Sequence, residues 1–223
     1  MNFSEHVLRF HKGLSPDWNL PKGFDLIYPF DNEETWSCMD QFYNKYFSDS
    51  HSRVFLLGIN PGRFGAGVTG VAFTDPWHLE EICKIDSQFQ KRKELSSIFV
   101  YQLIQEFGGP KAFYERFYIS SVCPLGFLKG KVNCNYYDDK GLQEKVKPQI
   151  LENLITQTEG FMKGSTVVCL GMGKNYKFLD RLNKEHKIFK KVIPLPHPRW
   201  IMQYRRKDVN KYAGEYLSVL EKL

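Results

Sequence analysis

The sequence has few cysteines, and no two of them are closely spaced. Its 223 residues include five cysteines, an odd number, and no C-x-x-C. A zinc knuckle or a dithiol redox site needs such spacing, and an iron–sulfur cluster needs four thiolates. These classes of site are therefore excluded. We expect all five to be buried, reduced thiols: Cys38, Cys83, Cys123, Cys134 and Cys169.

Long hydrophobic runs are missing as well. No apolar stretch approaches the roughly 20 residues of a membrane-spanning helix. Residues 1–6 lack the basic and apolar regions of a signal peptide. We therefore expect a cytoplasmic protein with no membrane contact. Hydrophobic residues make up 42% of the sequence and charged residues 25%, which excludes the disordered and fibrous classes.

The motifs of several enzyme classes are also absent. No G-x-S-x-G occurs, so a hydrolase nucleophile elbow is unsupported. The turn at residues 171–174 reads G-M-G-K, which has neither P-loop spacing nor the third glycine of a dinucleotide-binding fingerprint. It is either a plain strand-to-helix connection or, through Lys174, a contact to a phosphate. Nothing in the sequence indicates a metal or an organic cofactor, and we expect none.

Charge of neither sign dominates. Thirty-one Lys and Arg residues stand against 25 Asp and Glu residues, a formal net charge of +6. This excess is compatible with a polyanionic partner but does not establish one. The densest cluster is residues 198–207, P-R-W-I-M-Q-Y-R-R-K, which mixes four cations with Trp200, Met202 and Tyr204. Such a pattern is typical of nucleic-acid-binding surfaces, although a solvated surface turn would look the same.

Four short apolar, β-branched runs predict buried strands. They span residues 54–57, 117–119, 166–170 and 191–195. Helical patterns occupy residues 98–107, 142–156, 175–185 and 212–220. Strands that alternate with helices predict an α/β fold, a three-layer α/β/α sandwich with a central four-stranded parallel sheet. We expect a monomer with a single domain over residues 1–223, in which residues 1–50 form a helical N-terminal extension packed on the rest.

In a parallel sheet, reactive loops follow the carboxyl ends of the strands. After the first strand the sequence reads G-I-N-P-G-R-F-G-A-G-V-T-G-V-A-F, residues 58–73. So many glycines let the backbone approach a flat ligand closely. Asn60 offers a neutral amide that can hold a water, and Phe73 offers a stacking face. The alternative is a tight Asn-Pro-Gly turn with a buried phenylalanine.

Two later strands also end in candidate residues. Ser121 follows the second strand, where its hydroxyl either meets a ligand or merely eases packing. After the fourth strand, P-L-P-H-P-R-W places His197 between two prolines that fix where the imidazole points. A histidine held in this way at a strand's carboxyl end is a candidate catalytic residue.

The loops after the first and fourth strands together resemble the uracil-DNA glycosylase superfamily. The stretch G-I-N-P-G-R-F-G…T-G-V-A-F, followed by S-V-C-P-L, is similar to the single-strand-selective monofunctional branch, and to its bacterial second subgroup. The resemblance runs from about Val54 to Arg206. It implies a DNA glycosylase of base excision repair, a hydrolase that flips uracil or a related deaminated or damaged base out of DNA and cleaves its N-glycosidic bond.

The resemblance also implies roles for individual residues. Asn60 matches the residue that positions the attacking water, and His197 matches the one that hydrogen-bonds the departing base. Phe73 matches the aromatic that stacks on the extruded base, while the backbone of Ile59 and Gly62 matches the pocket lining. Ser121 stands where the family often has an asparagine that pairs with the uracil edge. The candidate DNA contacts are Lys174, Arg199, Tyr204, Arg205, Arg206 and Lys207.

Some alternatives stay open at this point. The family's H-P-S-P-R motif is compressed in this sequence. Alignment on Pro-Arg would put Leu195 in the place of the family's histidine. We favour His197, because no other histidine lies near that strand end. Asp75 either assists the water or caps the turn before Pro76. Two other functions also fit: a non-catalytic nucleic-acid-binding domain that keeps the fold, and an enzyme that binds free nucleotides through the turn at residues 171–174.

Overall fold

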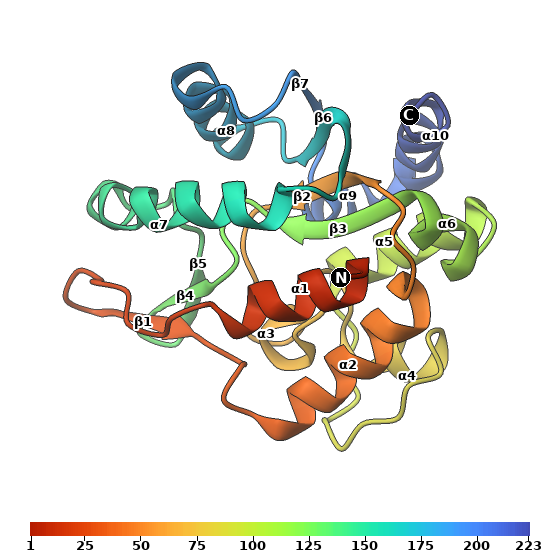
Figure 1. The fold of residues 1–223 in the computed structure, drawn as a ribbon, viewed down its shortest axis with the longest axis horizontal. Helices are drawn as coiled ribbons and strands as arrows, with labels where there is room; N and C mark the ends of the chain where they lie inside the picture. The colour runs from red at the N-terminus through yellow and green to blue at the C-terminus, as the bar shows by residue number, and fades with distance from the viewer.

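A four-stranded parallel sheet forms the centre of the protein (Figure 1). The computed structural model describes residues 1–223, except for the side chain of Lys163. The strands are β2 (Arg53–Gly58), β3 (Phe117–Ser121), β6 (Met162–Leu170) and β7 (Lys191–Leu195), in the order β3–β2–β6–β7. Each neighbouring pair is parallel, which confirms the predicted sheet.

The register of the strands brings their four carboxyl ends to one edge of the sheet. β2 is buried along its whole length, as expected for a central strand of a parallel sheet. Near its carboxyl end, Leu57 pairs with Ser120 of β3 on one side and Cys169 of β6 on the other. Leu170 of β6 pairs in turn with Leu195 of β7. The loops that carry the candidate residues therefore start side by side.

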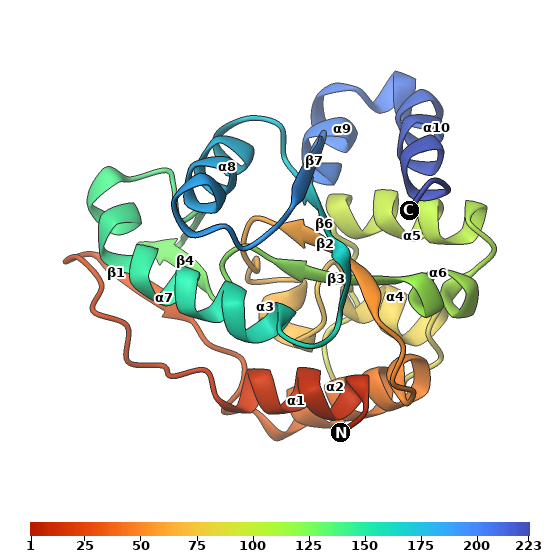
Figure 2. The ribbon, with the colours of Figure 1, turned by 45° about the horizontal axis from the view of Figure 1, so that its top comes forward.

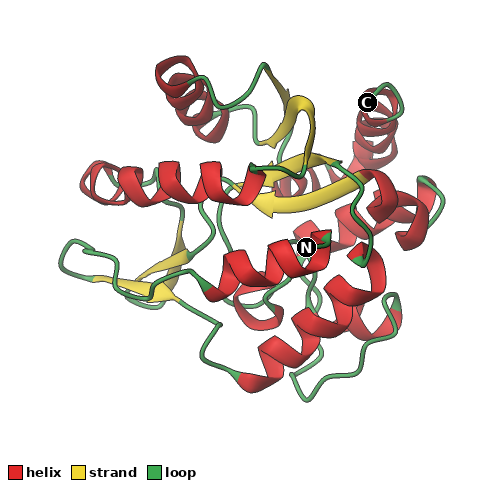
Figure 3. Ribbon diagram, in the orientation of Figure 1, coloured by secondary structure: helices red, strands yellow, loops and turns green.

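Helices cover both faces of the sheet (Figure 2). On one side α5 (Leu95–Glu106), α9 (Pro198–Tyr204) and α10 (Val209–Leu220) pack together, and on the other α1 (Phe3–Lys12) lies beside α7 (Lys140–Thr158). The predicted α/β/α sandwich is thus confirmed (Figure 3). The other helices are α2 (Glu33–Phe47), α3 (Ala66–Thr69), α4 (Pro76–Glu81), α6 (Pro110–Arg116), α8 (Lys174–His186) and the 3-10 turn η1 (Arg206–Asp208).

A second, antiparallel sheet was not predicted. It consists of β1 (Phe24–Ile27), β4 (Gly126–Lys129) and β5 (Val132–Cys134), in the order β1–β4–β5. Strands of three or four residues carry too little alternation to be recognised in a sequence. Through β1, the first fifty residues contain a strand as well as helices. The sheet also carries the segment after β5 to the carboxyl edge of the main sheet, where it becomes one wall of the site.

The N-terminal segment is held to the main sheet by an ion pair between buried Arg53 and partly exposed Asp49. Arg53, at the start of β2, is fully buried, and its guanidinium donates to both carboxylate oxygens of Asp49 at 2.7 Å. The rings of Phe3 and Phe47 lie 4.7 and 4.9 Å from the same guanidinium. Hydrogen bonds from Arg53 outweigh desolvation and lower the pKa of Asp49 to about 2. These contacts fix α1 and α2 against β2.

Two further expectations concern the whole chain. The five cysteines are buried and free, as predicted. In the described part of the chain, no helix combines the length and the apolar character that crossing a membrane requires.

Candidate active site

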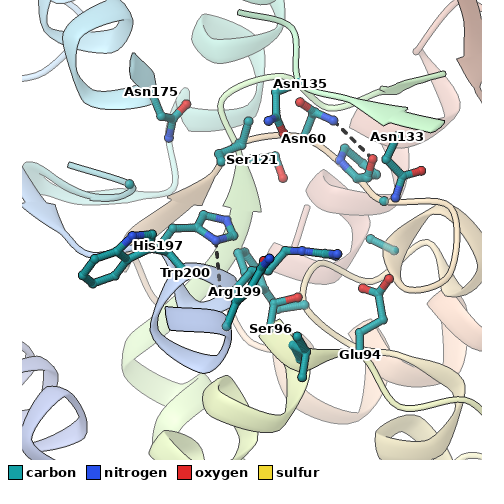
Figure 4. A pocket seen from close by; sticks show the side chains of 18 of the residues that line it. Asn60, Glu94, Ser96, Ser121, Asn133, Asn135, Asn175, His197, Arg199 and Trp200 are labelled. Carbon is teal, nitrogen blue, oxygen red and sulfur yellow. Dashed lines mark hydrogen bonds between the residues drawn. The ribbon is translucent and has the colours of Figure 1, made fainter. Parts of the chain in front are cut away.

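A cavity of about 1150 Å³ opens at the carboxyl edge of the main sheet (Figure 4). Loops after all four strands line it, together with the segment that follows β5. Nine of the predicted site residues lie in its wall: Ile59, Asn60, Gly62, Phe73, Ser121, Lys174, His197, Arg199 and Tyr204. The other three do not: Arg205, Arg206 and Lys207 are exposed at the end of α9 and in η1.

The side-chain amide of Asn60 is held in one orientation. Its Oδ1 accepts a hydrogen bond from the Tyr136 backbone N–H at 3.2 Å, and its Nδ2 donates to the Cys134 carbonyl at 3.4 Å. Because one partner is only a donor and the other only an acceptor, the amide cannot turn over without losing both bonds. Among the described residues Oδ1 accepts no second hydrogen bond, so its other lone pair can accept one from a ligand or a water.

The segment that holds Asn60 is itself tied to the strand ends. Tyr136 is fully buried, and its hydroxyl donates to Asn175 Oδ1 at 2.7 Å. Asn175 Nδ2 donates in turn to the carbonyls of Gly58 and Leu170, both at 3.3 Å. This chain of buried hydrogen bonds links β2, β6 and the segment after β5, so the position of Asn60 depends on all three.

Phe73 reaches the cavity through a close contact that only glycine allows. A Cβ at Gly58, the last residue of β2, would lie 2.6 Å from the Phe73 ring. Phe73 also has a left-handed backbone, with φ of 54°, which costs a non-glycine residue on the order of 1 kcal/mol. The buried Thr69 hydroxyl stabilises this turn by donating to the Thr74 carbonyl at 2.6 Å and accepting from the Val71 N–H. These contacts together fix the position of the Phe73 ring in the loop after β2.

The hydrogen bonds of His197 define its tautomer. Its Nδ1 accepts from the Arg199 backbone N–H at 3.1 Å, so a neutral ring carries its proton on Nε2. Desolvation, and then the nearby Arg199 charge, lower the pKa of His197 to about 4. The imidazole is therefore neutral at physiological pH, with an Nε2–H available as a donor.

His197, not Leu195, lies at the cavity. Leu195 is buried at the end of β7 and is not part of the cavity wall. The His197 ring centroid is 5.7 Å from that of Phe73, and the two ring planes are inclined by 42°. Figure 4 shows Ser121 on the same side of the cavity as Asn60. The stacking face, the imidazole donor and the amide therefore surround one space.

Asp75 has a different position from the other candidates. It is fully buried, does not line the cavity, and caps α4 by accepting from the His78 N–H at 2.9 Å. Its two oxygens also accept from His78 Nδ1 and the Glu94 N–H. Burial alone would raise the pKa of Asp75, but these hydrogen bonds outweigh it and lower the pKa. The turn cap is therefore its observed role.

The wall of the cavity is strongly cationic. Among the side chains that the structure describes, six cations line it against two acids: Arg63, Arg92, Lys93, Lys131, Lys174 and Arg199 against Glu94 and Glu215. Four large apolar side chains in the same wall are exposed to solvent: Val132, Met172, Trp200 and Tyr204. Cations mixed with exposed apolar groups suit a ligand that carries both phosphates and unstacked bases.

Sequence analysis missed several residues of this wall. Asn133, Asn135 and Tyr137 come from the segment around β5, and Glu94 and Ser96 from the start of α5. Their loops follow no strand of the main sheet, so the carboxyl-end rule could not find them. Asn175 directly follows the G-M-G-K turn, which was the one local signal for it. Among the residues described, no three His, Cys, Asp or Glu side chains are grouped so as to hold a metal ion.

Comparison with known proteins agrees with this geometry. The family model of the Uracil DNA glycosylase superfamily matches residues 45–221, so the chain belongs to that superfamily. A crystal structure of wild-type SMUG2 from Pedobacter heparinus has a TM-score of 0.96 to this protein at 44% sequence identity, and the match covers 100% of this chain and 98% of that one. The resemblance drawn from the G-I-N-P-G motif is confirmed, and with it a glycosylase-type protein that acts on DNA.

Proposed function

We propose that this protein is a monofunctional DNA glycosylase that hydrolyses the N-glycosidic bond of uracil or a related deaminated base in DNA. The observation that carries the proposal is the convergence of three groups on one cavity: the fixed amide of Asn60, the Nε2–H of neutral His197 and the ring of Phe73. Membership of the uracil-DNA glycosylase superfamily supports the same reaction class.

The base leaves as an anion, and His197 stabilises it. Cleavage of the bond gives the sugar oxocarbenium character and places negative charge on the base oxygens. A preorganised donor aimed at such an oxyanion is typically worth about 3 kcal/mol in the transition state. A neutral imidazole fits this role, because it donates a hydrogen bond from Nε2 to the departing base and keeps its own proton. Backbone N–H groups of the loop at Ile59 and Gly62 add further donors.

Asn60 positions the attacking water rather than deprotonating it. An amide has no basic form at physiological pH, so its contribution is one of proximity and orientation. Tyr136 and Cys134 hold the amide in one orientation. In that orientation the free lone pair of Oδ1 would accept a hydrogen bond from the water. Since the sugar already carries positive character, a well-placed neutral water suffices as the nucleophile. The proton that it loses as the new C–O bond forms passes to the base anion or to bulk water.

The target base has to leave the stack to reach this cavity. Phe73 would then stack on it, while Arg199 or Tyr204 of α9 occupies the space it vacates. Lys174 and the cations after α9, Arg205, Arg206 and Lys207, would bind flanking phosphates, which makes the affinity salt-dependent. Ser121 reads the base edge with a hydroxyl, which both donates and accepts and therefore accommodates more than one base.

An excision assay tests the proposal. The protein is incubated with a uracil-containing oligonucleotide in EDTA, and the product is then treated with alkali. Strand scission at the uracil supports a glycosylase that needs no added metal. Binding without scission would contradict the proposal and favour a non-catalytic nucleic-acid-binding domain. A control oligonucleotide with thymine at the same position shows whether cleavage depends on the base.

A further inference from the structure

A set of cations lies near Glu94 and Asn133, which border the cavity across from His197 and Trp200 (Figure 4). The guanidinium groups of Arg63 and Arg92 both lie over the Phe64 ring, 4.5 and 3.8 Å from its centroid. Lys93 Nζ lies 3.4 Å from the centroid of the Trp77 ring. Arg63 also donates to the carbonyl of Lys131, the fourth cation. We call these four cations and two rings the Phe64 wall.

The Phe64 wall lacks carboxylate partners. In the part of the chain that the structure describes, none of its four cations forms an ion pair, whereas the neighbouring Lys91 pairs with Glu80. All four cations are exposed and line the cavity. Glu94, which follows Lys93, lines the same cavity; burial, together with Asp75 and opposed by Arg199 and Arg92, raises the pKa of Glu94. The wall therefore presents net positive charge to solvent.

We propose that the Phe64 wall binds the phosphates of the DNA strand on one flank of the target nucleotide, opposite to the flank bound by α9. The inference rests on the proposed function, since it assumes that a DNA strand crosses this cavity. The two sides are distinct: in Figure 4, Glu94 and Asn133 border the cavity on one side and Trp200 and His197 on the other.

The aromatic contacts explain why these cations suit phosphates. A guanidinium stacked on a ring loses part of its conformational freedom, while the N–H groups on its edge stay free to donate. Those edge donors match the geometry of phosphate oxygens. A cation already paired with a carboxylate, such as Lys91, would first have to give up that partner. The Phe64 wall is thus ready to bind without rearrangement.

Binding measurements on two charge-matched variants test the proposal. The probe is a single-stranded oligonucleotide with a central tetrahydrofuran in place of the target nucleotide, which the protein cannot cleave. Arg92→Gln/Lys93→Gln removes two cations of the wall. Lys111→Gln/Lys145→Gln removes two exposed cations that do not line the cavity. Affinity is measured by fluorescence anisotropy at several salt concentrations, and thermal unfolding checks that each variant is folded.

The wall variant is expected to show a smaller salt dependence. Each lost contact to a single strand reduces the slope of log affinity against log salt by about 0.7, so two contacts reduce it by about 1.4. The control should keep the wild-type slope. Shortening the oligonucleotide on one flank should then weaken the wild type and the control, but hardly affect the wall variant. Shortening the other flank should weaken all three.

The outcomes separate this inference from the proposed function. A wild-type salt slope in the wall variant, or an equal loss of affinity in both variants, would overturn the proposed role of the Phe64 wall. This holds even if uracil excision is normal. A reduced slope in the wall variant, in a protein that excises no base, would support the wall as a nucleic-acid-binding surface and overturn only the glycosylase proposal.

Discussion

The backbone N–H of Tyr136 donates to the side-chain oxygen of Asn60 at 3.2 Å, and this bond fixes the orientation of the amide. Tyr136 lies 76 residues further along the chain, in a segment that the second sheet carries to the carboxyl edge of the first. The orientation of the candidate catalytic amide is therefore a tertiary property, although the amide itself stands in a local motif.

Replacing Asn60 tests its role in placing the water. In Asn60→Ala the single-turnover excision rate should fall by roughly 100-fold or more, since a misplaced nucleophile loses its proximity advantage. Affinity for the uncleavable tetrahydrofuran oligonucleotide should stay within a few-fold of wild type. The exposed Asn210→Ala serves as the matched control. Near-normal excision by Asn60→Ala would remove the residue from the mechanism.

The contact between Gly58 and Phe73 predicts a selective effect of a small substitution. A methyl group in Gly58→Ala would overlap the ring, and overpacking of this kind costs about 1–3 kcal/mol. The ring has to move, so excision should fall even at temperatures where the variant is fully folded. Gly214→Ala adds the same methyl in open space on α10 and should leave the rate unaltered. Equal activity of the two variants would contradict the stacking role of Phe73.

The pKa of His197 predicts that the pH profile has no acidic limb from this residue near neutral pH. Because burial lowers this pKa from 6.5 to about 4, the neutral ring that donates from Nε2 persists well below neutral pH. Single-turnover excision should therefore show no limb from His197 between about pH 5 and pH 8. The rate is measured across this range in wild type and in His197→Ala. A limb near pH 6.5 in the wild type alone would mean that the ring titrates normally.

Asp75 offers a way to separate stability from catalysis. The Asp75 carboxylate accepts hydrogen bonds from three donors, and Asp75→Asn would turn an amide N–H toward one of them. A buried donor left without an acceptor in this way costs about 1–3 kcal/mol. The free energy of unfolding should fall by that amount. Excision at a permissive temperature should fall far less than in Asn60→Ala. A rate loss as large as that of Asn60→Ala, without a loss of stability, would show that Asp75 acts on the water.

The main sheet and part of the site were predictable because their signals are local. Each buried strand is a short apolar run, and the carboxyl-end rule then led to Asn60, Ser121 and His197. The second sheet was not predictable, since its strands are too short to show a period. Tyr136 and Asn175, which hold Asn60, are recognisable only once that sheet brings distant segments together.

The Phe64 wall was missed for a related reason. Residues 91–93 read K-R-K, but nothing in the sequence shows that Arg63 and Lys131 lie beside them in the fold. The stretch at residues 198–207 was noticed because it combines four cations with aromatic side chains in one short segment. In the structure, only part of that stretch reaches the cavity, because the short helix α9 ends at Tyr204 and Arg205–Lys207 follow outside the cavity wall.

The dependence of excision on the acidity of the departing base tests most directly whether the base leaves as an anion held by His197. Single-turnover rates are measured for a series of 5-substituted uracils in one oligonucleotide, with wild type and His197→Ala. We expect faster excision of the more acidic bases, and a steeper dependence in His197→Ala, where the leaving group has to carry more of the charge unaided. Rates that do not vary with acidity, and that are the same in both proteins, would contradict the mechanism.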